Sequence, residues 1–343
     1  MKRRSGGAEA FSPRGLSTAA FAVASVVLLT VLGVSAFLIG SSSVSLAEFV
    51  AWVSGAEVSD AAKSILANVR LPRVLAALLS GAALAVAGAI IQAVLDNPLA
   101  SPNVIGVNSG AGLFVLVAAA LLPHALWAAP FAAFAGALAT SAMIFGISLG
   151  AGVSRLTVVL SGIAITTVFG AGMNVVMIVA PDAYIGSSVF LAGGLSGVLL
   201  DDLAWPAILI AVGLTAAMLG AHRLNVVALG DDMACALGLN VRMVRLSMLV
   251  VASLLAGAAV SFAGLLGFVG LIVPHIVRFL VGSDNRAVLP VSAVAGAAFV
   301  VGCDLVARTA FAPYEVPVGI LMAFVGGPFF IYLIFRNRRG DLG

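Results

Sequence analysis

The sequence predicts an all-α polytopic membrane protein with ten transmembrane helices, and three observations lead to that prediction. First, 62% of its 343 residues are hydrophobic and only 9% are charged, whereas a soluble domain carries about 25% charged residues. Second, the charged residues leave apolar intervals of the length that crosses a bilayer, about 20 residues. Third, the basic residues gather at the ends of these intervals, mostly on one predicted side, as the positive-inside bias requires.

The first half of the chain is expected to hold five spans. The run near 17–40 follows a basic cytoplasmic tail, 1–15, and is longer than the roughly 7–15 apolar residues of a signal peptide, so it is interpreted as an uncleaved first span. The second span is placed at 74–95. The interval 97–154 has no Asp, Glu, Lys or Arg and holds two spans with a turn at Pro123-His124, and the fifth span lies between Arg155 and Asp182.

The second half is expected to hold five more. The sixth span lies between Asp202 and Arg223, and a glycine-rich break divides the next interval into spans near 244–263 and 264–281. The ninth and tenth spans occupy 286–304 and 315–336, which leaves a cytoplasmic tail, 337–343, after a single transmembrane domain, 16–336. Basic residues flank both ends of this domain, so both ends are predicted to be cytoplasmic and the number of spans even. Thirteen cations then lie inside, against four outside: Lys63, Arg70, Arg73 and Arg308.

A faint internal repeat relates the two halves. The eight residues 81–88 match 257–264 at five positions, and these segments lie in the second and seventh spans, which run in opposite directions. This indicates an inverted five-plus-five repeat, as in many transporters. The alternative is that small-residue packing faces resemble one another by composition alone.

The longest predicted cytoplasmic loop, 222–243, contains a short helix over 231–237. Asp231 and Asp232 lie in its first turn, where acids are favoured, and Gly238 ends it. Its exposed face would be small and apolar, which suits either a docking element for a partner or a solvated connector.

Arginines on the predicted outer side need an explanation, because positive residues are disfavoured there. Arg70 and Arg73 flank Leu71-Pro72, and Arg308 ends the ninth span. They could meet an acidic partner. Alternatively they anchor lipid headgroups, and Asp304 is spaced to pair with Arg308 on one helix face.

Two further irregular segments are expected. The turn 96–103, on the inner side, contains two prolines and is either a gate or only a tight connection. The outer segment 181–202 is too short to span and could form a half-helix at the mouth of a pathway.

Several kinds of chemistry are excluded or disfavoured. The two lysines, Lys2 and Lys63, do not follow glycine-rich turns, so no P-loop of the usual pattern exists and ATP hydrolysis by that route requires another subunit. The scattered basic residues do not form a nucleic-acid footprint. Cys235 and Cys303 lack metal-ligand spacing. His275 lies inside the eighth span, and the sequence has no second candidate metal ligand at helical spacing from it, which favours a structural role over an intramembrane enzyme.

Many ordered motifs together resemble those of the FecCD permeases, the membrane subunits of type II ABC importers for iron-siderophores, haem and vitamin B12. The resemblance covers nearly the whole chain beyond its N-terminal tail. Its motifs are 70–73 (RLPR), 81–84 with Gly88 and Gln92, 97–100 (NPLA), 106–111 (GVNSGA), 229–238, 267–275 (GFVGLIVPH), 289–290, 304–308 (DLVAR) and 317–319 (PVG).

The resemblance implies a set of partners and a bacterial cytoplasmic (inner) membrane location. Two ATP-binding subunits would carry ATP-Mg inside, since this chain would have no cofactor of its own. A solute-binding protein would dock outside, and a second copy of the chain would complete a homodimer. The fifth span, the half-helix after it and the tenth span would line the path.

The resemblance also implies roles for particular residues. Those for binding-protein docking are Arg70, Arg73 and Arg308. Those of a cytoplasmic gate are Asn97, Leu99 and Ser154. Those of the loop that couples to the ATP-binding subunit are Leu229, Gly230, Asp231, Asp232, Ala236, Leu237 and Gly238.

The cargo expected from the motifs 97–102 and 106–110 is a ferric siderophore, with haem and vitamin B12 as alternatives. An ion-coupled secondary transporter is the alternative of another class, although acids near the predicted midplane are nearly absent.

Overall fold

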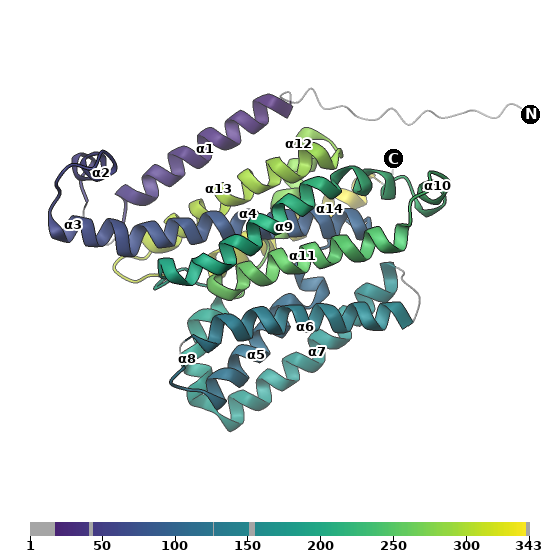
Figure 1. The fold of residues 1–343 in the computed structure, drawn as a ribbon, viewed down its shortest axis with the longest axis horizontal. Coiled ribbons are helices and arrows are strands. Elements are labelled where there is room, and N and C mark those ends of the chain that lie inside the picture. The colour runs from purple at the N-terminus through teal and green to yellow at the C-terminus, as the bar shows by residue number, and fades with distance from the viewer. Residues whose placement is uncertain (1–17, 41–43, 126, 151–154, 341–343) are drawn as a thin grey trace, which may run out of the picture.

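The computed structural model describes residues 18–40, 44–125, 127–150 and 155–340, and every regular element in those ranges is helical (Figure 1). The all-α prediction is therefore confirmed for the described chain. The long helices are α1 Thr18–Leu38, α4 Leu71–Leu95, α5 Val107–Leu121, α6 Ala128–Gly150, α7 Arg155–Val179, α9 Leu200–Val227, α11 Val241–Ala263, α13 Asn285–Thr309 and α14 Val318–Gly340. The shorter elements are α2 Leu46–Val53, α3 Asp60–Ser64, the π-helix η1 Ile65–Arg70, the 3₁₀-helix η2 Pro102–Ile105, α8 Pro181–Ala192, α10 Asp231–Ala236 and α12 Val269–Val281.

Seven helical segments of the described chain are long and apolar enough to cross a membrane: 18–38, 60–95, 128–148, 156–179, 200–227, 241–263 and 285–309. The other predicted spans correspond to shorter apolar helices, Val107–Leu121, Val269–Val281 and Val318–Ile331. Fifteen residues of α-helix rise about 22 Å, less than the roughly 30 Å of a hydrocarbon core. The count of ten spans therefore stays a prediction. Helix α14 also continues past residue 336, where the last span was expected to end.

Helix α4 lies at the centre of the fold, with α13, α11, α12 and α9 packed around it. Glycines allow these close approaches: a Cβ atom on Gly81 would overlap the backbone of Gly296 in α13, and one on Gly88 would overlap the backbone of Gly270 in α12. Helices α5 to α8 form a second group beside α9 and α11 (Figure 1), joined mainly through α6 on α11.

The segment before the second predicted span differs from expectation. The second span was expected to begin at residue 74, after Arg70 and Arg73, but helix is continuous from residue 60 to 95. Pro72 lacks an N–H donor but lies in the first turn of α4, and the preceding turn is π-helical, with the Leu71 N–H donating to the Leu66 carbonyl five residues back. The wider turn carries the helix through the proline.

The long helices lie roughly side by side, so the molecule has two ends. Helices α2 and α3 lie at one end and α10 at the other (Figure 1). We call these the α2 end and the α10 end; they are the predicted outer and inner sides, respectively.

Candidate functional site

At the α2 end, the three predicted docking arginines lie together and are buried. Arg70, Arg73 and Arg308 are 3%, 8% and 5% exposed. Arg70 donates from Nη1 to the Phe37 carbonyl, and Arg308 donates from Nη2 to the Ala36 carbonyl at 2.7 Å. Two of the three arginines therefore bind the last turn of α1.

Arg73 is shared between two carboxylates of its own chain. Its Nε lies 3.0 and 3.1 Å from the two oxygens of Asp304, and its Nη1 lies 2.7 Å from Oε2 of Glu315. Asp304 also faces Arg308, with 3.8 Å between Oδ2 and Nε, as the helical spacing predicted. We call Arg73, Asp304, Arg308 and Glu315 the ion cluster.

The two acids of the ion cluster have different surroundings. The Asp304 side chain is 5% exposed and the Glu315 side chain 34% exposed. Glu315 also accepts a hydrogen bond from Ser196 Oγ at 2.8 Å. Partial burial opposes ionisation of Glu315, but the hydrogen bonds from Arg73 and Ser196 outweigh it and hold the pKa of this carboxyl below its usual range. Glu315 is therefore ionised at neutral pH.

Sequence reasoning missed Glu315, which lies in the connection between α13 and α14, just before the Pro317-Val318-Gly319 motif. The position of an acid beside a recognised motif was the available signal. The predicted docking role of the arginines stays a prediction, now with the added fact that Arg73 already contacts two acids.

At the α10 end, the expected short helix forms. Gly230 and Gly238 bound it with φ values of 100° and 79°, a left-handed region that favours glycine. Large apolar side chains on α10 and at its two ends point outward: Leu229, Met233 and Leu237 are 62%, 57% and 63% exposed. The other predicted coupling residues of this loop, Asp231, Asp232 and Ala236, are also exposed.

One ion pair fixes α10 to α11, and sequence reasoning did not find it. Arg245 Nη1 and Nη2 contact the two oxygens of Asp231 at 2.9 and 2.6 Å. The Arg245 side chain is 8% exposed and that of Asp231 is 52% exposed. Such a two-point contact fixes orientation as well as distance, so the outward face of α10 has a defined direction.

A polar network anchors the helix that leads into α10. Asn225, near the end of α9, accepts from both the backbone and the side chain of Asn285 at 2.8 Å and donates to Asp284 at 2.6 Å. Arg278 of α12 donates to Asn285 at 2.8 Å and to the Ala89 carbonyl of α4 at 3.1 Å. Near this end of the molecule, α4, α9, α12 and α13 are thereby joined to one another.

The predicted gate turn follows α4 at the same end. Asp96 adopts a left-handed conformation with φ of 47°, and the Leu99 N–H donates to the Asn97 side chain at 2.9 Å. Asn97 is exposed and Leu99 half-buried. Ser154, the third predicted gate residue, lies outside the described residues.

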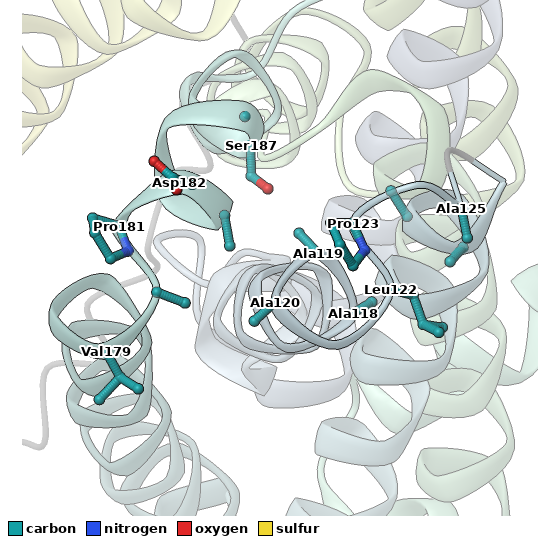
Figure 2. Close-up of a pocket in the computed structure, with 15 residues that line it drawn as sticks. Ala118, Ala119, Ala120, Leu122, Pro123, Ala125, Val179, Pro181, Asp182 and Ser187 are labelled. Atoms are coloured by element: carbon teal, nitrogen blue, oxygen red, sulfur yellow. The ribbon is translucent and has the colours of Figure 1, made fainter.

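The half-helix expected after the fifth span forms as α8, and a cavity of about 500 Å³ opens beside it. Figure 2 shows the α7–α8 junction on one side, with Val179, Pro181, Asp182 and Ser187, and the α5–α6 turn on the other. The fifth span and the half-helix were predicted to line the path. The opposite wall of this cavity comes from the end of α5, and the predicted lining of the path, which includes the tenth span, stays a prediction. Among the described lining residues only Asp182 is charged.

No group of three or more His, Cys, Asp or Glu residues that could hold a metal ion occurs within the described ranges. His275 packs edge-on against Phe329, with 6.2 Å between ring centroids. This contact with an apolar ring suits a structural role.

Sequence similarity to known proteins extends over almost the full length of the chain. The family model described as "FecCD transport family" matches residues 27–336. The hemin transport system permease protein HmuU of Yersinia pestis is 38% identical over 93% of this chain and 96% of its own length. The iron(3+)-hydroxamate import system permease protein FhuB of Bacillus subtilis is 42% identical over 80% of this chain and 72% of its own length. The cobalamin import system permease protein BtuC of Halobacterium salinarum is 39% identical over 82% and 76%, respectively.

A solved structure agrees with the fold. It is described as an inward-facing conformation of a metal-chelate type ABC transporter, and it superposes with a TM-score of 0.82 at 26% identity. The match covers 92% of this chain and 98% of that one.

Proposed function

The chain belongs to the FecCD transport family, and from that premise we propose that it is the permease subunit of an ATP-driven importer. Its cargo would be an iron chelate, in first place a ferric siderophore, taken from a solute-binding protein outside a bacterial cytoplasmic membrane. The energy would come from ATP-Mg on two separate ATP-binding subunits, with a second copy of this chain completing the permease.

The observation that carries this proposal is the exposed apolar face of α10. Leu229, Met233 and Leu237 project at the end opposite α2 and α3, and Arg245 holds the helix in one direction. If ATP drives the chain, the lack of a P-loop means that another subunit hydrolyses it, and a fixed apolar face of this kind suits the groove of such a partner. Asn97, Leu99 and Ser154 keep their proposed role in the gate that this work opens.

The proposed topology has ten spans, both termini inside, and an inverted five-plus-five repeat in one permease domain, 16–336, between tails 1–15 and 337–343. Packing supports the repeat. Helix α4 packs on α13 and α11 packs on α6, and these are equivalent pairs if the second and seventh spans correspond. Likewise, α5 packs on α6 and α12 packs on α13.

Haem and vitamin B12 are the alternative cargoes, because named relatives at 38% to 42% identity include hemin, hydroxamate and cobalamin permeases. The nearly uncharged wall of the 500 Å³ cavity gives little basis for selecting among them. We therefore place most of the specificity in the solute-binding protein.

The experiment that tests this function is uptake by cells expressing the complete system, with iron-labelled siderophore, haem and cobalamin compared. We expect siderophore uptake that survives a protonophore as long as cellular ATP is held constant. Collapse of uptake under the protonophore with ATP unchanged would instead favour an ion-coupled secondary transporter.

Replacement of Arg245 by methionine should uncouple α10 without unfolding the chain. Methionine fills the buried volume, and the half-exposed Asp231 can return to water. Loss of a charge-assisted contact costs about 1.5–3 kcal/mol, so we expect uptake per ATP hydrolysed to fall at least roughly 10-fold. The measurement compares ATP hydrolysis with uptake in the same membranes. Arg242→Met makes the same substitution at an exposed arginine of α11 and serves as the control; equal losses in both variants would contradict the role of Arg245.

A further inference from the structure

The ion cluster at the α2 end contains one acid that a partner could replace. Arg73 directs Nε and Nη2 to Asp304 and Nη1 to Glu315. Asp304 also faces Arg308, with 3.8 Å between Oδ2 and Nε, and it is almost fully buried. Glu315 lies in a connection between helices and is 34% exposed. One carboxylate is thus fixed and the other accessible.

The accessible carboxylate borders a small cavity of about 210 Å³. Arg73, Ser196 and Glu315 supply its polar wall, and Val189, Gly194, Leu195 and residues 316–318 complete it. An incoming side chain from outside would therefore meet Glu315 and Nη1 of Arg73 at the same place.

Glu315 also connects two segments that hold the ends of separate helices. Its Oε2 accepts from Ser196, which lies between α8 and α9, while Glu315 itself lies between α13 and α14. Next to this contact, the Gly319 N–H at the start of α14 donates to the Gly193 carbonyl at the end of α8, at 2.9 Å. Release of Glu315 would leave these two connections joined mainly by that backbone hydrogen bond.

We propose that Glu315 occupies the place of a partner's carboxylate on Arg73, and that an aspartate or glutamate of the docking solute-binding protein displaces it. The displacement frees the 193–199 and 310–317 connections. With them it frees the end of α8 at Ala192 and the start of α14 at Val318. This inference rests on the proposed docking role of the arginines and adds the residue that competes for it.

The exchange of one carboxylate for another leaves no buried charge without a partner. Arg73 is buried, and leaving a buried charge without a partner is strongly destabilising. Replacing one carboxylate by another keeps Arg73 paired throughout, so the partner gains an ion pair without creating an unpaired charge. Docking then depends on the difference between two similar contacts, and removing the internal competitor should strengthen it.

The test measures binding of the cognate solute-binding protein to the assembled permease and ATP-binding subunits in lipid nanodiscs. Glu315→Gln should bind about 1.5- to 5-fold more tightly, the range expected for a partly exposed ion pair. Ser196→Ala keeps all charges but removes one hydrogen bond to Glu315, so it should shift affinity in the same direction by less. Weaker or unchanged binding by Glu315→Gln would overturn the exchange.

Two controls separate competition by Glu315 from a general charge effect and from a failure of the proposed docking role. Asp182→Asn removes the same charge from exposed surface at the start of α8; an equal gain there would mean that general electrostatics, rather than competition, explains the result. The pair Arg73→Gln with Asp304→Asn removes one buried charge of each sign, leaves Arg308 hydrogen-bonded to the Ala36 carbonyl, and should weaken docking at least about 10-fold. If that pair binds normally, the proposed docking role fails; if it binds weakly while Glu315→Gln gives no gain, only the exchange fails.

Hydrogen–deuterium exchange gives an independent readout. Docking should raise amide exchange in 193–199 and 315–319 of the wild-type chain, and Glu315→Gln should show the raised exchange before docking. Exchange that falls on docking in both segments would contradict the release.

Discussion

Replacing Met233 and Leu237 together with aspartate is expected to lower ATP-driven uptake at least about 100-fold while the chain still folds. The two side chains are 57% and 63% exposed, so the change removes no core packing. At protein interfaces, a central apolar anchor contributes about 2 kcal/mol, or roughly 30-fold in affinity. Two added charges against an apolar groove would cost more. Retention of the ATP-binding subunits on affinity-tagged permease measures the loss directly.

The matched control is Val50→Asp with Val53→Asp on α2. These residues are 56% and 65% exposed and lie at the opposite end of the molecule (Figure 1). This control variant should keep the ATP-binding subunits. Equal loss from both double variants would show that exposed charge harms insertion generally, and normal retention by the α10 variant would reject α10 as the coupling element.

Replacing Gly88 with valine is expected to prevent accumulation of folded protein. A Cβ atom at this position would overlap the carbonyl oxygen of Gly270, and its neighbours are backbone atoms of α12 that cannot rotate away. Overpacking commonly costs about 1–3 kcal/mol and occasionally more, and a clash between two backbones lies at the upper end. Helices that approach this closely depend on small residues at the crossing. Fluorescence-detected size-exclusion chromatography of detergent extracts would measure the loss.

Gly33→Val in α1 is the control for this change, because nothing lies within 4 Å of a Cβ atom there. It should give a monodisperse peak close to that of the wild type. A monodisperse Gly88→Val protein with normal thermal stability would mean that α4 and α12 are farther apart than described.

The features that could be predicted from the sequence are those decided by local chemistry. Both ends of α10 could be predicted, because acids lie in its first turn and Gly238 follows its last. Helices α8 and α11 could be predicted from short-range composition. The path of the chain through Pro72 could not, because the π-helical turn that carries it depends on where η1 packs. The partners of Arg73 could not either, since Asp304 and Glu315 are 231 and 242 residues away and meet it only after α4, α13 and the following connection are assembled.

For the spans, too, some features could be predicted from the sequence and others could not. Charge-free intervals mark where apolar helix occurs, and helices form near all the predicted positions. Their lengths were less predictable, because α12 ends at Gly282 and begins after the left-handed Phe268, features of backbone conformation rather than composition.

The most direct test of the account is transport into proteoliposomes that contain this chain with and without its ATP-binding subunits. With both, the loaded solute-binding protein outside and ATP-Mg enclosed, we expect accumulation of the iron chelate that stops when a non-hydrolysable nucleotide replaces ATP. Without the ATP-binding subunits, we expect none. Accumulation by this chain alone, in the absence of nucleotide, would contradict the account.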